Sequence, residues 1–168
     1  MPTAARPYAL PAYDLGRVRL RPVTEADAAA LGAGLAAIEP WRRLNYAEKA
    51  LSDSLMRPDP AISRLAIYDG SDLAGVVAVR EPWLRGPYLE LLGLLPPAQG
   101  RGIGSRVMQW FEAEAPARAS NLWVLCSDFN AGALAFYERH GFVRMTAIES
   151  LVGEGFSEIL LRKRLVRG

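Results

Sequence analysis

The sequence predicts an α/β fold, a mixed central sheet of about six or seven strands with helices on both faces. Strand-like and helix-like segments alternate along the chain in the order strand, two helices, three strands, helix, strand, helix, two strands. The nearly continuous apolar run from Tyr88 to Leu95 is typical of a strand buried on both faces. A glycine-rich turn over 99–105 joins that run to an amphipathic helix.

Composition and charge narrow the class of protein. With 168 residues, 51% hydrophobic and 23% charged, the chain 1–168 is expected to form a single soluble domain. The formal net charge of +2, from 20 Lys+Arg against 18 Asp+Glu, is too even to predict a nucleic-acid partner. No apolar run reaches the roughly 18 residues of a membrane span, so no membrane partner is expected. One cysteine and no signal-peptide pattern favour a cytoplasmic location.

The first half of the chain is read from alternation and from helix-start signals. Residues 1–12 contain three prolines and little pattern, so a flexible N-terminal arm is expected. Thr24 followed by Asp27 is typical of a capped helix start. Asp69-Gly70-Ser71-Asp72 predicts a hairpin turn. The expected elements here are strands over 18–21, 64–68 and 73–79 and helices over 24–38 and 46–56.

The second half follows the same rules. Gly93 lies inside the apolar strand, where glycine marks a bulge or a close approach of the backbone. Asn130 is a suitable N-cap, and Gly141 suits the position just past a helix C-terminus. The expected elements are strands over 88–95, 121–127, 142–152 and 156–164 and helices over 102–114 and 131–140.

The glycine-rich turn Gln99-Gly100-Arg101-Gly102-Ile103-Gly104-Ser105 is the most informative segment. Glycines let the backbone turn tightly, and the N–H groups at a helix N-terminus favour an anion such as a phosphate. Arg101 and Arg106 add positive charge nearby. The P-loop pattern fails because it lacks its lysine, and the dinucleotide fingerprint fails because these glycines are spaced by two. Taken alone, the segment also fits a plain structural turn.

Two motifs together resemble the GNAT superfamily of N-acetyltransferases. Gln99-x-x-Gly102-x-Gly104 resembles the coenzyme A pyrophosphate loop of that family. Asn130-Ala131-x-x-Leu134-x-Phe136-Tyr137-x-x-x-Gly141-Phe142 resembles its second coenzyme A segment, in the right order and spacing. The resemblance is clearest from Leu73 to Phe142 and implies the GNAT fold, with acetyl-CoA as co-substrate and no metal.

The resemblance also implies how coenzyme A binds. The strand before the glycine loop would bulge at Leu92-Gly93-Leu94 and part from the next strand, so that the pantetheine arm lies in the gap. The pyrophosphate would rest on main-chain N–H groups of the glycine turn. The cofactor-binding residues so expected are Leu92, Gly93, Leu94, Gln99, Gly100, Arg101, Gly102, Ile103, Gly104, Ser105, Asn130 and Tyr137.

Two residues are expected to be catalytic. Tyr137 matches the family tyrosine that protonates the departing thiolate, although a core tyrosine is the ordinary alternative. Glu90, on the strand beside the thioester, is the candidate general base, and its alternative is an ion pair with one of the many arginines. Asn130 is expected both to cap its helix and to contact the pantetheine region. Weaker site candidates are Tyr88, Asp128 and Glu81.

Other polar residues have simpler interpretations. A buried, inert thiol is expected of Cys126, and His140 fits the last turn of its helix. Pro40-Trp41-Arg42-Arg43 and Trp83 either line the acceptor site or pack their loops.

The predicted reaction is direct attack of a primary amine on the thioester. The acceptor is unassigned, and the sequence leaves a monomer or a homodimer open. A non-catalytic acyl-CoA-binding or regulatory domain and a nucleotide- or phosphate-binding protein are the alternatives.

Overall fold

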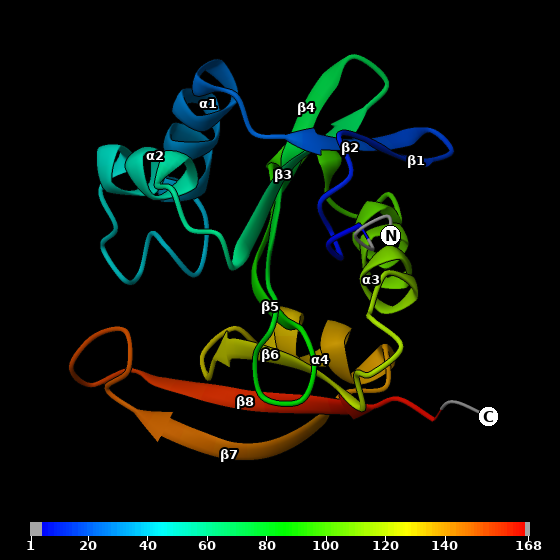
Figure 1. The fold of residues 1–168 in the computed structure, drawn as a ribbon. Coiled ribbons are helices and arrows are strands. Elements are labelled where there is room, and N and C mark those ends of the chain that lie inside the picture. Colours follow the sequence, from blue (N-terminus) through cyan, green and yellow to red (C-terminus); the bar gives the residue numbers. More distant parts are fainter. Residues whose placement is uncertain (1–4, 167–168) are drawn as a thin grey trace.

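The computed structural model describes residues 5–166, which form a mixed eight-stranded sheet with helices on both faces (Figure 1). The strand order is β1-β2-β3-β4-β5-β6-β8-β7, and every neighbouring pair is antiparallel except β5 and β6. The predicted α/β class is confirmed. The strands are β1 (Tyr13–Leu15), β2 (Val18–Pro22), β3 (Ile62–Asp69), β4 (Asp72–Arg80), β5 (Tyr88–Leu94), β6 (Asn121–Ser127), β7 (Val143–Glu149) and β8 (Ser157–Arg164). The helices are α1 (Glu25–Ala36), α2 (Glu48–Met56), α3 (Ile103–Ala113) and α4 (Ala131–Arg139), with a short 3-10 turn at Pro96–Ala98.

Within the expected flexible arm over 1–12, Tyr8 packs into the core although most of residues 5–12 are exposed, and residues 1–4 lie outside the described part of the chain. Tyr8 is only 1% exposed, and its hydroxyl donates a hydrogen bond of 2.7 Å to the Phe111 carbonyl. Its ring meets Trp110 edge-on, with centroids 5.3 Å apart. These contacts join segments about a hundred residues apart, so no local sequence pattern could predict them.

Side-chain alternation along β4 separates the core into two clusters. Val76 packs with Leu31 and Leu35 of α1 and with α2 on one face. Val77, the next residue, belongs to the cluster formed with α3 and α4 on the other face. Successive strand residues point to opposite faces, so α1 and α2 cover one face and α3 and α4 the other (Figure 1).

The predicted capping box at the start of α1 is confirmed. Thr24 Oγ1 accepts from the Asp27 N–H at 3.2 Å, and Asp27 Oδ2 accepts from the Thr24 N–H at 3.0 Å. Tyr68 of β3 also donates to Asp27. Burial alone would raise the pKa of the Asp27 carboxyl, but the hydrogen bonds from Tyr68 and Thr24 outweigh burial and lower it. The cap therefore also fastens α1 to the sheet.

The parallel strands β5 and β6 part soon after they meet. They are paired only at Tyr88 with Trp123 and at Leu89 with Val124. The bulge expected at Leu92-Gly93-Leu94 lies elsewhere, because the β4–β5 register skips Glu90 and runs regularly through Gly93.

The second explanation for a glycine inside a strand, a close approach of the backbone to a neighbour, applies at Gly93. A Cβ there would lie 2.5 Å from Leu35 Cδ2 and 3.0 Å from Trp41 Cη2, so the glycine permits a close approach. Within residues 5–166, no helix has the length and hydropathy needed to cross a bilayer.

Candidate active site

A groove of about 600 Å³ lies between the C-terminal end of β5 and the N-terminus of α3. Its walls come from β5, the glycine turn, the first turn of α3 and one side of α4 along the whole helix. All the expected cofactor-binding residues except Arg101 line it: Leu92, Gly93, Leu94, Gln99, Gly100, Gly102, Ile103, Gly104, Ser105, Asn130 and Tyr137. Residues from the α1–α2 connection and Gly132, Ala133, Phe136 and Arg139 of α4 complete it; none of these four was singled out as a cofactor-binding residue from the sequence.

The main chain of β5 presents polar groups to this groove. The Leu95 N–H donates to the Ala74 carbonyl at 2.8 Å. Bonding direction alternates along an antiparallel ladder, so the N–H and C=O of Leu94 face away from β4 and into the gap. The Gln99 side chain lies on that side, because its Nε2 donates to the Leu94 carbonyl at 3.0 Å. Leu92, two residues earlier, has the same orientation. The parted strand can therefore hydrogen-bond an extended amide chain.

The glycine turn shapes the other end of the groove. Gly100 and Gly102 have φ angles of 71° and 76°, a left-handed conformation that strains residues with a Cβ. Gly102 is the N-cap of α3 and supplies no side-chain hydrogen bond to it. The first N–H groups of α3 point toward the N-terminal end, where the positive end of the helix dipole also lies. This arrangement suits a diphosphate.

The two arginines of the glycine turn do not line the groove. Arg101 forms an ion pair of 2.9 Å with Asp69, which is 6% exposed. Arg106 donates to the Leu15 carbonyl at 3.1 Å. Both side chains therefore have structural partners outside the groove, and a role for Arg101 in cofactor binding through its main-chain N–H stays a prediction. Their partners lie in β1 and β3, and only the folded topology brings them close.

Asn130 caps the start of α4, Tyr137 lies about two turns further along the helix, and both side chains line the groove. Asn130 Oδ1 accepts from the Ala133 N–H at 3.2 Å, which confirms the predicted cap. Tyr137 is 7% exposed and lines the groove. Burial raises the pKa of the Tyr137 phenol above its ordinary value, and the neighbouring Cys126 and Tyr88 contribute in the same direction. The phenol is therefore protonated at neutral pH and able to donate.

A second, smaller cavity of about 230 Å³ adjoins the groove. The two cavities share Pro40, Trp41, Leu92, Asn130, Ala133 and Tyr137. The remaining walls of the small cavity are Leu44, Tyr46, Tyr88, Glu90, Leu91, Leu125, Cys126, Ser127, Leu151, Val152 and Glu158. Tyr137 thus lies where two cavities meet, as a transfer reaction between two substrates requires.

Comparison with known proteins agrees with this geometry. Residues 18–142 match the sequence model of the Acetyltransferase (GNAT) family. The chain belongs to that family. The family uses acetyl-CoA as co-substrate, and the chain is a GNAT-type N-acetyltransferase.

Solved structures show the same fold. An acetyltransferase from Thermus thermophilus is 21% identical with a TM-score of 0.70, over 90% of this chain and 99% of that one. The ribosomal-protein-S18-alanine N-acetyltransferase from Escherichia coli is 17% identical with a TM-score of 0.63, over 90% and 96%. A spermidine N-acetyltransferase chimera from Vibrio cholerae and hSSAT is 19% identical with a TM-score of 0.65, over 89% and 96%.

Two carboxylates of this GNAT chain line the small cavity. Glu90 is 35% exposed and forms an ion pair of 3.3 Å with Arg80, the structural alternative expected for it. Glu158 of β8 is 7% exposed and accepts a hydrogen bond of 2.5 Å from Ser127. The sequence analysis did not single out Glu158. The sequence shows only a carboxylate at the start of an apolar strand. The direction of the Glu158 side chain toward the small cavity follows from the β6–β8 register, which pairs Glu158 with Ser127.

The other polar candidates lie in structural roles. Burial raises the pKa of the Cys126 thiol to about 12, so it is a thiol and not a thiolate, as expected of an inert cysteine. Glu81 is buried and paired with Arg118. Of the residues expected to line the acceptor site or pack loops, Pro40 and Trp41 line the small cavity, whereas Trp83 packs on Tyr88 with ring centroids 4.8 Å apart.

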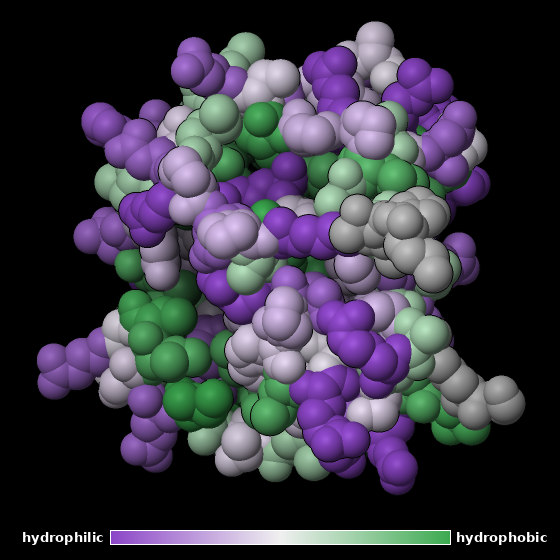
Figure 2. Space-filling view, in the orientation of Figure 1, coloured by the Kyte–Doolittle hydropathy of each residue, from purple (hydrophilic) through white to green (hydrophobic). Residues whose placement is uncertain are grey.

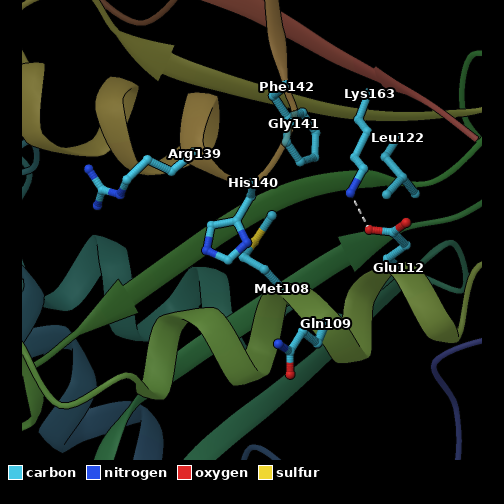
Figure 3. A pocket seen from close by; sticks show the side chains of 9 residues that line it. All are labelled: Met108, Gln109, Glu112, Leu122, Arg139, His140, Gly141, Phe142 and Lys163. Atoms are coloured by element: carbon cyan, nitrogen blue, oxygen red, sulfur yellow. Dashed lines mark hydrogen bonds and ion pairs between the residues drawn. The ribbon is translucent and has the colours of Figure 1, made fainter.

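His140 lines another cavity, of about 370 Å³, between α3 and the C-terminal end of α4, and Arg139 lines both this cavity and the groove (Figure 3). Its Nε2 is 3.1 Å from Ser105 Oγ, so the ring supports the first turn of α3. Burial, together with nearby Lys163 and Arg139, lowers the pKa of His140. Lys163 in the same cavity is paired with Glu112 at 2.5 Å. This cavity shares no lining residue with the small cavity that contains Glu158.

Proposed function

We propose that this chain transfers an acetyl group from acetyl-CoA to a primary amine by direct attack within a ternary complex. The observation that carries the proposal is the meeting of two cavities at Tyr137. The large groove presents the main chain of β5 and the N-terminus of α3, and the small cavity opens beside it.

In this proposal the groove binds acetyl-CoA, which supplies the activated acetyl thioester. The pantetheine amides bond the outward-facing groups of Leu92 and Leu94, and the N–H groups from Gly100 to Ser105 hold the pyrophosphate. The outward-facing N–H of Leu94 then supports the developing oxyanion. Asn130 fixes the start of α4 and so the position of Tyr137, which contacts the coenzyme A sulfur.

Proton movement follows from the same residues. The amine needs a base before it can attack, and Glu90 and Glu158 are the carboxylates of the small cavity. Tyr137 donates its proton to the sulfur as the carbon–sulfur bond breaks. Its raised pKa keeps that proton in place until the thiolate forms.

Calorimetry with acetyl-CoA, followed by thiol release with a panel of primary amines and peptides with free N-termini, tests the proposal. We expect saturable binding and amine-dependent release of coenzyme A. Binding without transfer to any amine would favour a non-catalytic acyl-CoA-binding domain. Stabilisation by ATP or NAD but not by acetyl-CoA in a thermal shift would favour a nucleotide-binding protein.

A further inference from the structure

The small cavity is asymmetric in charge. Its charged wall residues are Glu90 and Glu158, both acidic, and no Lys or Arg of the described chain lines it. Most of the other walls are apolar or aromatic: Pro40, Trp41, Leu44, Leu91, Leu125 and Val152. A cavity of this kind attracts a cation attached to an apolar group and disfavours an anion.

The two carboxylates differ in availability. Glu90 lies on the bulge of β5, its side chain is 35% exposed, and it is paired with Arg80, which Asp59 shares. Arg64 also interacts with both carboxylates, so two cations offset the charges of Glu90 and Asp59. Glu158 has Ser127 as its neighbour, a hydroxyl that donates one hydrogen bond and leaves the carboxylate charge uncompensated. Among residues 5–166 no ion pair to Glu158 is formed. A buried carboxylate without a cationic partner is poised for a cationic ligand.

The chemistry around Glu158 suits a base. Burial raises the pKa of the Glu158 carboxyl, the Ser127 hydrogen bond lowers it, and Asp128 raises it, with a net increase. A carboxyl whose pKa rises toward neutrality accepts a proton more readily than an ordinary glutamate. The titratable groups that line the cavity with it are Tyr46 of the α1–α2 connection, Tyr88 and Glu90 of β5, Cys126 of β6 and Tyr137 of α4. Asp128, just after β6, acts on Glu158 from outside the cavity lining.

We propose that the acceptor is a primary amine on an apolar body that enters as its ammonium, and that Glu158, not Glu90, binds this ammonium and removes its proton. The inference rests on the proposed function.

Two protons leave the ammonium during the transfer. Glu158 takes one proton from the ammonium. The free nitrogen then forms its bond to the acetyl carbon, and the carbon–sulfur bond breaks. Tyr137 gives its proton to the departing sulfur, and its phenolate takes the second proton from the nitrogen. One proton has thus reached sulfur, and Glu158 releases the other to water.

A matched pair of acceptors tests the substrate class. Hexylamine and 6-aminohexanoate share a chain, but the second carries a carboxylate that would enter an acidic cavity. We expect kcat/KM with hexylamine to exceed that with 6-aminohexanoate by about tenfold or more. Equal values, or no transfer to hexylamine when a peptide in the panel is acetylated, would overturn the class while leaving the transferase proposal intact.

Glu158→Gln tests the base, with Glu90→Gln as the matched control. With the best acceptor of the panel, we expect Glu158→Gln to lower kcat/KM by about 10²-fold or more, and Glu90→Gln to lower it less than about fivefold. Acetyl-CoA binding by calorimetry should equal that of the wild type in both variants, which also verifies folding. Glu158→Asp keeps a carboxylate and should recover part of the loss.

The pH profile separates a base from a structural residue. The wild type should show an acidic limb in kcat/KM as the Glu158 carboxyl gains its proton. In Glu158→Gln that limb should disappear, and the rate should follow the free-amine fraction alone. A Glu158→Gln enzyme that binds acetyl-CoA and keeps the wild-type rate and profile would overturn the assignment, as would a larger loss in Glu90→Gln. Failure of the wild type to bind acetyl-CoA would instead sink the transferase proposal.

Discussion

Tyr137 is buried where the two cavities meet. Among the described residues of α4 that line both cavities, it is the one whose side chain can donate a hydrogen bond. A phenol with a raised pKa holds its proton until a stronger base appears beside it. In the proposed mechanism the thiolate that forms as the thioester breaks is that base, and burial raises its proton affinity as well. The proposed role of Tyr137 thus depends on burial as much as on chemical type.

Removing that hydroxyl should slow catalysis without unfolding the chain. Tyr137→Phe keeps the ring that packs at 6.0 Å from Phe142, so the fold should be retained. We expect kcat to fall about 10²–10⁴-fold, with KM for acetyl-CoA changed little. Steady-state thiol release measures both values. Tyr13→Phe, which loses a hydrogen bond from the Leu10 N–H, is the control, and a Tyr137→Phe enzyme with wild-type kcat would contradict the assignment.

How much of the site could be predicted depended on whether its residues act through local or distant contacts. The glycine turn and the Asn130 cap are local, so their spacing in the sequence already fixed their geometry. Arg101 is turned aside by Asp69, and Glu158 faces the small cavity because β8 pairs with β6. Both depend on register between distant strands, which no single segment encodes.

The capping box of α1 is an element-scale device with a pH signature. Because the folded pKa of Asp27 is lowered, its contribution to stability is present above the unfolded value of about 3.9 and is lost as pH falls through the folded pKa. Asp27→Asn should therefore cost about 1–2 kcal/mol at pH 7. The difference from wild type should shrink between about pH 5 and pH 2. Urea unfolding across that range measures it, and a constant difference down to about pH 2 would refute the linkage.

The contact between β5 and α1 at Gly93 gives another element-scale prediction. Gly93→Ala would push a methyl group against Leu35 and Trp41, so we expect a loss of about 1–3 kcal/mol in the free energy of unfolding. Because Trp41 lines both cavities, KM for acetyl-CoA should rise as well.

Gly153→Ala is the matched control, since a Cβ there meets Phe156 at an ordinary 3.4 Å. We expect the control to lie within about 0.5 kcal/mol of wild type. Equal stability of the two variants, from chemical denaturation, would argue against the close approach at Gly93.

At the scale of the whole molecule, the N-terminal segment closes one end of the larger core. Tyr8→Ala should cost about 3–5 kcal/mol, because it empties a site bounded by Trp110 and Phe111. Tyr8→Phe should cost about 1 kcal/mol through the lost bond to the Phe111 carbonyl. Leu10→Ala, at a side chain 43% exposed, should change little. Thermal unfolding compares the stabilities of the three variants. A Tyr8→Ala protein as stable as Leu10→Ala would support the interpretation of this segment as a flexible arm.

The order of elements and the two-faced packing followed from periodicity, since each apolar stripe needs a cover. The eighth strand did not: β1 is three residues long, and pairing with β2 holds it in place. Figure 2 shows apolar side chains gathered on the side of the β7–β8 connection, where Leu151 and Val152 are 51% and 37% exposed. These two residues line the mouth of the small cavity, so the apolar character of its walls continues to the surface.

Because β5 and β6 separate after a short paired stretch, the sheet consists of two halves, or leaves, joined at one short segment. β1 to β5 form one leaf, β6, β8 and β7 form the other, and two residue pairs bind them. A ligand whose amides hydrogen-bond both halves of the sheet would replace the hydrogen bonds that β5 and β6 do not form with each other. Ligand binding would then also hold the two halves of the sheet together, and the backbone amide protons of β5 and β6 would exchange more slowly with solvent when the ligand is bound.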